Sequence, residues 1–106
     1  MDAVFDALAD PTRRRVVETL ARGGTVTASG LAAQLPITRQ AVAKHLSALQ
    51  GAELVSSSRV GRETQYKLRP QPLDEAAHWI QMVSADWDDR LEALRRSLEK
   101  RTGRSR

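Results

Sequence analysis

Residues 39–49 combine a face that can form hydrogen bonds with a face that must be buried. Val42, Leu46 and Leu49 recur at helical spacing, so a helix over this stretch packs one side inward. Its other side presents short polar and basic groups, which follow one another as Thr38, Arg39, Gln40, Ala43, Lys44 and Ser47. Arginine can bond both major-groove acceptors of guanine, and glutamine can bond adenine in the same way. These residue types therefore predict a helix that reads bases in the major groove of DNA.

The residues before this stretch predict a second, shorter helix and a tight turn. Thr27 can cap the shorter helix, Pro36 ends it, and Thr38 caps the helix that follows. Residues 27–51 thus have the layout of a helix-turn-helix, whose second helix enters the major groove. His45 lies beside the apolar face, so we expect a partly buried structural histidine rather than a base contact.

Residues 53–70 predict a small β-hairpin with a basic tip, which we call the wing. Apolar and polar residues alternate around Tyr66, so one face is expected to be buried and the other wet. Gly61 permits the positive φ that a tight hairpin tip requires. Arg59 and Arg62 flank this glycine and are expected to meet the DNA backbone or minor groove, setting affinity and salt dependence more than sequence preference.

The rest of the chain predicts further helices and a short strand around the helix-turn-helix and the wing. Residues 1–24 have the pattern of two short helices, and residues 25–27 suit a small strand that pairs with the hairpin. Residues 73–100 predict one long helix, and residues 101–106 a basic tail. The expected fold is a single domain, mainly α with a small antiparallel β-wing, with five or so helices and a long C-terminal dimerisation helix.

The predicted last helix carries an apolar stripe over about five turns. Its large side chains follow one another every three or four residues, as Ile80, Val83, Trp87, Leu91, Leu94 and Leu98. A chain of 106 residues has room for one modest core, which the other helices already occupy. We therefore expect a second copy to cover the stripe in a two-fold homodimer. The alternative is a helix folded back on its own domain.

Charge is distributed unevenly along the chain. The sequence carries a net charge of +4, yet residues 19–73 hold seven basic groups against two acidic ones, and residues 74–99 three against seven. The basic block coincides with the segment predicted to read DNA, as attraction to phosphates requires. A solvated basic face without a partner would look the same, so the charge supports the prediction without establishing it.

Composition excludes several functional classes. The chain has no cysteine, which excludes a disulfide framework, a thiolate metal site and a cysteine nucleophile. It shows no phosphate-binding glycine loop and no recognisable catalytic triad, so we expect no enzyme and no cofactor. No apolar run approaches the roughly 20 residues that span a bilayer, and the start lacks the pattern of a signal peptide. The expected location is the cytoplasm, with no membrane partner.

Four short motifs together resemble the ArsR-type winged helix-turn-helix repressors. In order along the chain they are ALADPTR at 7–13, GLA at 30–32, AVAKHLSAL at 41–49 and GRETQY at 61–66. The resemblance implies a homodimer paired through the first and last helices, which adds Phe5 to the interface formed by the apolar stripe. It also implies repression by occupying an operator near the protein's own promoter.

The sequence departs from the metal-sensing relatives. Where they carry a cysteine motif on the third helix, residues 30–35 offer no ligand. A second family site takes Asp and His from paired C-terminal helices, but here a metal would require His78 from two copies. Trp79 and Trp87 with residues 90–94 resemble a cysteine-free subgroup, which implies an unknown inducer that is not a metal. We expect these tryptophans to fill the dimer core; lining an inducer pocket is the alternative.

The sequence thus predicts a sequence-specific transcriptional regulator that binds double-stranded DNA as a homodimer and acts as an autoregulatory repressor. A non-specific architectural DNA binder is one alternative, and it predicts salt-dependent binding without a preferred sequence. A winged helix that serves protein interaction is the other, and it predicts no release of counterions from DNA.

Overall fold

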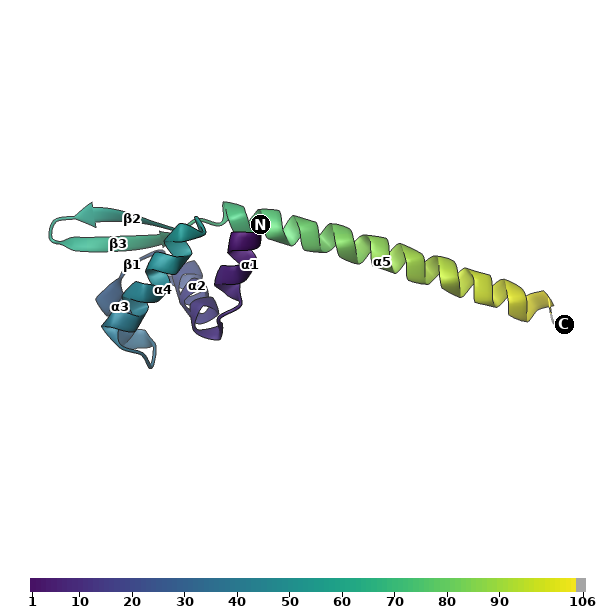
Figure 1. The fold of residues 1–106 in the computed structure, drawn as a ribbon, viewed down its shortest axis with the longest axis horizontal. Helices are drawn as coiled ribbons and strands as arrows, with labels where there is room; N and C mark the ends of the chain where they lie inside the picture. The colour runs from purple at the N-terminus through teal and green to yellow at the C-terminus, as the bar shows by residue number, and fades with distance from the viewer. Residues whose placement is uncertain (105–106) are drawn as a thin grey trace. The chain divides into compact units, whose positions relative to one another are not determined.

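The computed structural model describes the backbone of residues 1–104 and the side chains of residues 1–101, as five helices and one three-stranded sheet (Figure 1). The elements follow as α1 (Asp2–Leu8), α2 (Pro11–Gly23), β1 (Thr25–Thr27), α3 (Ala28–Gln34), α4 (Arg39–Gly51), β2 (Val55–Val60), β3 (Glu63–Leu68) and α5 (Gln71–Arg104). The chain divides into two compact units, Met1–Glu75 and the part of α5 from Ala76 onward. The expected fold class, a mainly helical winged helix-turn-helix, is confirmed.

Side-chain caps define the starts of three helices. Asp10 caps α2, Thr27 caps α3 and Thr38 caps α4. Their oxygens accept hydrogen bonds of 2.7 to 3.1 Å from backbone N–H groups two or three residues further on. Those N–H groups have no acceptor within the helix, so each cap supplies the hydrogen-bond acceptor that they would otherwise lack. The capping residues expected for both helices of the helix-turn-helix are confirmed.

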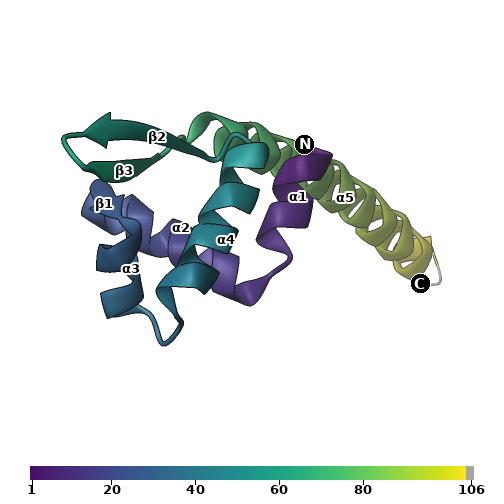
Figure 2. The same ribbon diagram turned by 60° about the vertical axis from the view of Figure 1, so that its left-hand side comes forward.

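The sheet places the wing beside the helix-turn-helix. Strand β3 lies in the middle and pairs antiparallel with β1 on one side and β2 on the other. Gly61 has a φ of +63° at the turn between β2 and β3, as expected for the hairpin tip. The hairpin of β2 and β3 projects from the helices (Figure 2). The wing is therefore tied to the start of α3 through β1.

The core of the first unit lies where α2, α3 and α4 meet the base of the wing. Its fully buried side chains are Val16, Leu20, Leu31, Val42, Leu46, Leu49 and Leu54. Helix α4 contributes three of them, all on one face, because they recur at helical spacing. The opposite face of α4 is therefore not needed for the core and stays available for binding. Helix α1 buries Val4 and Ala7 and leaves Phe5 36% exposed.

Helix α5 is longer at both ends than the range 73–100 expected from the sequence. It begins at Gln71 because Pro72 falls in the first turn, where a missing N–H costs no hydrogen bond. It continues to Arg104, since basic residues favour the C-terminal end of a helix dipole. Residues 101–104 of the expected tail are thus helical, whereas Ser105 and Arg106 lie outside the described residues. Within the described chain, no helix is long and apolar enough to cross a membrane.

The apolar stripe of α5 is exposed. Its six side chains are between 45% and 58% accessible, and they are Ile80, Val83, Trp87, Leu91, Leu94 and Leu98. Large apolar patches of this kind on a folded chain mark interaction sites.

Glu53 ends α4 in the left-handed conformation that favours glycine. Its φ is +60°. The backbone N–H of Leu54 donates to the carbonyl of Leu49, and that of Glu53 to the carbonyl of Gln50, both at 3.0 Å. This pair of bonds is the Schellman arrangement that closes many helices, usually with glycine at the left-handed position. A glutamate therefore occupies a position where its Cβ is strained.

Glu53→Gly is expected to raise the free energy of unfolding by about 0.5–1 kcal/mol. Glycine relieves the left-handed strain, and the greater freedom of glycine in the unfolded chain offsets only part of that gain. Urea unfolding followed by circular dichroism measures the difference. Glu18→Gly, in the middle of α2, is the matched control and should lower the stability by about 1 kcal/mol. A Glu53→Gly protein no more stable than the unmodified chain would contradict the expectation.

Candidate nucleic-acid interface

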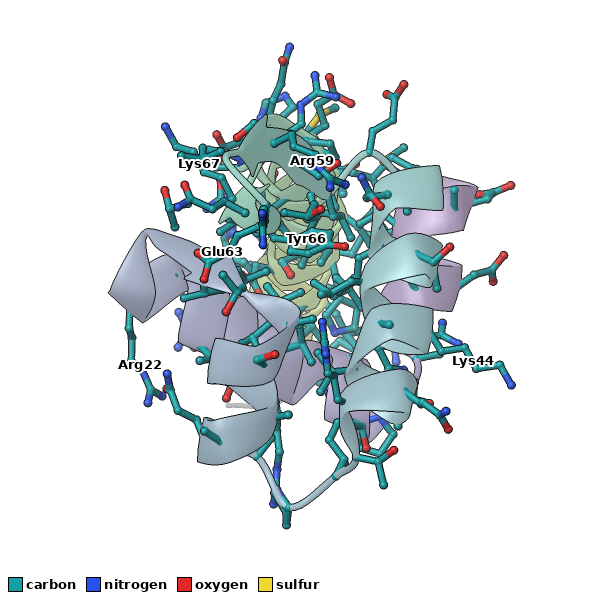
Figure 3. The ribbon with its side chains drawn as sticks, turned by 90° about the vertical axis from the view of Figure 1, so that its left-hand side faces the viewer. Arg22, Lys44, Arg59, Glu63, Tyr66 and Lys67 are labelled. Atoms are coloured by element: carbon teal, nitrogen blue, oxygen red, sulfur yellow. The ribbon has the colours of Figure 1, made fainter. Side chains whose placement is uncertain are left out.

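The outward face of α4 carries the residues predicted to read DNA. Thr38 caps the helix, and the others lie along its exposed side, as Arg39, Gln40, Ala43, Lys44 and Ser47. Lys44 projects away from the helix in Figure 3. On the opposite side Val42, Leu46 and Leu49 have no solvent-accessible surface. Helix α4 therefore has one apolar, buried face and one polar face with short side chains turned to solvent, as the sequence predicts.

A groove of about 430 Å³ lies between α4, the start of α3 and the wing. Arg39 of α4, Arg59 of β2 and Arg62 of the hairpin tip all line it, so we call it the arginine groove. Among the described residues that line it, Glu63 is the one acidic residue. The predicted DNA contacts of the helix and of the wing thus meet at one concave surface, which carries a net positive charge suited to phosphate.

Four hydroxyl groups in this groove were not predicted from the sequence to lie there. Thr27, Ser29, Thr64 and Tyr66 line it together with the arginines. The register explains the two from the wing, because Thr64 lies opposite Arg59 in the hairpin, and Tyr66 falls two residues further along the same face of β3. Strand alternation around Tyr66 is the signal in the sequence that indicates which wing side chains share a face. These hydroxyls add neutral hydrogen-bond donors beside the positive charge.

One hydrogen bond holds the wing to α4. Nε2 of Gln50, in the last turn of α4, donates to Oγ of Ser57 on β2 at 2.8 Å. The backbone N–H of Arg69 donates to the carbonyl of Leu54 at 2.8 Å, which continues the pairing of β2 and β3 at the base of the wing. The bond of Gln50 to Ser57 therefore links the two elements that form the walls of the arginine groove.

The charged groups behind α4 have a structural role. Arg13 and Arg14 donate from their Nη1 atoms to backbone carbonyls of residues 6–9, over 2.7 to 3.5 Å, and so close the end of α1. The backbone N–H groups of Arg13 and Thr12 donate to the Asp10 carboxylate and hold its pKa below the ordinary value. His45 is half-buried, as expected for a structural histidine.

No cluster of metal ligands occurs in the described part of the chain. A metal ion needs three or more His, Asp or Glu side chains close together, and none of the residues that the structure describes gather in that way. A site built from His78 of two copies stays a hypothesis about the dimer.

Comparison with known proteins places this geometry among transcription regulators. Residues 8–57 match the model of a helix-turn-helix domain family. The transcriptional repressor SdpR of Bacillus subtilis is 35% identical over 80 residues, which cover 76% of this chain and 88% of SdpR. The HTH-type transcriptional regulator Rv2034 of Mycobacterium tuberculosis is 43% identical over 72 residues, covering 68% of this chain and 66% of Rv2034.

A solved structure extends the likeness to most of the chain. It is an ArsR-like transcriptional regulator from Rhodococcus sp. RHA1, with a TM-score of 0.83 and 42% sequence identity. The match covers 93% of this chain and 90% of the other, so it includes the wing and most of α5 as well as the helix-turn-helix.

Proposed function

We propose that this chain, which belongs to the ArsR family of DNA-binding transcriptional regulators, represses transcription by binding an inverted-repeat operator as a homodimer. The family is one of regulators, and the chain is not an enzyme. The observation that carries the proposal is that predicted DNA contacts from two elements meet at one surface. Arg39 and Ala43 of α4 line the arginine groove together with Arg59 and Arg62 of the wing, whereas Gln40, Lys44 and Ser47 lie outside its lining.

Helix α4 and the wing make different kinds of contact with DNA. Helix α4 enters the major groove, where Arg39 bonds guanine and Gln40 bonds adenine, while Ala43 leaves room for close approach. Lys44 and Ser47 reach a base edge or the adjacent phosphate. The wing holds the backbone or minor groove through Arg59 and Arg62, around the turn at Gly61. Sequence preference then comes from the helix and much of the affinity from the wing.

A homodimer supplies the second recognition helix that an inverted repeat requires. The exposed apolar stripe of α5, together with Phe5 of α1, supplies the interface, because a two-fold axis would bury the same surface on both copies. Two recognition helices related in this way contact half-sites about 10 base pairs apart.

Repression is supported by the relative SdpR, which is itself named a transcriptional repressor. We propose that the operator lies near the protein's own promoter, so that the protein limits its own synthesis. Because the chain has no cysteine, its inducer is a ligand other than a metal bound by thiolates. Trp79 and Trp87 then serve mainly to fill the dimer core.

Selection of bound sequences from a random duplex pool, at near-physiological salt, tests this function. The expected result is an enriched inverted repeat with half-sites about one helical turn apart. A pool that is retained without enrichment would instead support an architectural DNA binder. A pool that is not retained at all would favour a winged helix that serves protein interaction.

Arg62→Ala is expected to weaken binding equally on all sequences and to lower the salt dependence. Removing one phosphate contact should reduce the slope of log affinity against log salt by about 0.9. Titrations of the operator and of a shuffled duplex at several salt concentrations measure this slope. Arg15→Ala, on the exposed side of α2, makes the same change in net charge and should leave the slope as it is. An unchanged slope in Arg62→Ala would remove the wing tip from the interface.

A further inference from the structure

We infer that the hydroxyl groups of Tyr66 and Thr64 donate hydrogen bonds to the phosphates of the DNA backbone in the arginine groove, and so supply a part of the affinity that salt does not weaken. The inference rests on the proposed function and deepens it, because it adds two neutral DNA contacts to the charged ones. Serine, threonine and tyrosine hydroxyls are common donors to phosphate oxygens in protein–DNA complexes.

Tyr66 and Thr64 share the face of β3 that is turned to the groove. Both line the groove together with the arginines. The register agrees with this, because Thr64 lies directly opposite Arg59 in the hairpin and Tyr66 is two residues further along β3. In Figure 3, Tyr66 and Arg59 lie between the wing and the helices, whereas Lys67 projects to the outside. The lining of the groove and the register thus place both hydroxyl-bearing side chains on the side of the sheet that carries Arg59.

Neither of these two hydroxyls has a partner in the described part of the chain. The side-chain hydroxyls that form hydrogen bonds there are those of Thr19, Thr27, Thr38 and Ser57. Tyr66 and Thr64 are nevertheless half-buried. Polar groups withdrawn from water normally have a partner, and phenylalanine and valine would fill the same space without one. The two hydroxyls are therefore available to a group that enters the groove.

The central position of β3 holds Tyr66 in place before DNA arrives. Its backbone pairs with Val26 of β1 on one side and with Ser57 of β2 on the other. The tyrosine side chain has only two rotatable angles, so little conformational entropy is lost when its hydroxyl forms a bond. A long, exposed arginine side chain loses more when it is ordered. Tyr66 is thus well suited to fix the position of a phosphate that the arginines attract.

The DNA backbone passes through the groove in the proposed complex. Helix α4 lies in the major groove and the wing at the adjacent minor groove, so the sugar–phosphate strand between those grooves runs between α4 and the wing. Its phosphate oxygens accept hydrogen bonds both from the arginines and from the hydroxyls. The two kinds of contact differ in one measurable respect. Charged contacts release counterions from DNA and weaken with salt, whereas a hydroxyl carries no charge and releases none.

Tyr66→Phe tests the inference, because it removes the hydroxyl and keeps the ring. Fluorescence anisotropy titrations at several salt concentrations use the operator obtained by selection and a shuffled duplex of equal length. The variant is expected to bind both duplexes about fivefold more weakly at every salt concentration. The slope of log affinity against log salt should stay as it is, unlike the slope of Arg62→Ala. Thr64→Val, which keeps the branched shape, should weaken both duplexes about threefold in the same way.

Two controls separate a DNA contact from a structural role. Urea unfolding should give the same stability for Tyr66→Phe, Thr64→Val and the unmodified chain, because neither hydroxyl bonds the described protein. Ser58→Ala removes an exposed hydroxyl that pairs with Gln65 on the other face of the wing and does not line the groove. It should leave the affinity for both duplexes unchanged.

Unchanged DNA affinity in Tyr66→Phe would overturn the inference. So would a loss confined to the operator, because a base contact would then be responsible, and so would a loss of stability that accompanies the loss of binding. Failure of the proposed function looks different. The unmodified protein would then bind DNA without preferring any sequence, and the shuffled duplex would still test the two hydroxyls. An unmodified protein that binds no duplex would overturn both.

Discussion

Leu91→Asp is expected to abolish the homodimer and to weaken operator binding by at least about a hundredfold. Leu91 lies in the middle of the apolar stripe and is 45% exposed in the single chain. Its replacement should leave the first unit folded, because no part of that unit's core is touched. In the dimer, however, the two-fold axis would bury a carboxylate on each side of the interface without a partner, at a cost of several kcal/mol. Each recognition helix would then bind its half-site alone.

Sedimentation at micromolar protein concentration, followed by titration of the operator, measures both effects. The variant should sediment as a single species of 11.7 kDa. Ala93→Asp, on the same helix but away from the stripe, adds the same charge and should remain dimeric. Circular dichroism checks that the helices persist. A dimeric Leu91→Asp protein would contradict the interface, and an unmodified chain that already sediments as a monomer would favour the folded-back helix.

The positions of the polar face of α4 could be predicted because they depend on local pattern alone. Val42, Leu46 and Leu49 recur every three or four residues, so the face opposite them is known once a helix is assumed. The capping threonines follow from the same local chemistry. Neither inference needs to know where any other element lies.

The arginine groove could not be predicted because it joins segments that are distant in sequence. Its walls come from the start of α3, the first half of α4 and both strands of the wing. Which hydroxyls line it depends on the register of β1, β2 and β3, and a shift of one residue would turn Tyr66 and Thr64 to the other face. Motif spacing carries no information on that register.

The end of α4 shows a second limit of local reasoning. Gly51 lies within α4, and the left-handed position that favours glycine falls on Glu53 two residues later. The burial of Leu54 explains the difference, because the chain must turn late enough to bring that side chain into the core. Tertiary packing therefore decides where the helix ends, at the expense of local preference.

Arg39 connects the two proposed kinds of contact, because it belongs to the polar face of α4 and also lines the arginine groove. Two roles are open to it. As a base contact it would bond the O6 and N7 atoms of guanine, and as a phosphate contact it would act like Arg62. The two roles differ in how a substitution changes binding to matched and mismatched operators.

Arg39→Ala is expected to cost about 1–3 kcal/mol of discrimination at one base position of each half-site. Removal of the guanidinium leaves guanine without its partner at that position, while Gln40 continues to read its neighbour. Titrations against the operator and a set of single-base variants should show preference lost at one position and kept at the others. Arg62→Ala is the control, since it should weaken matched and mismatched sites alike. If Arg39→Ala behaved in the same way, Arg39 would be a phosphate contact, and the reading of guanine would have to come from Lys44.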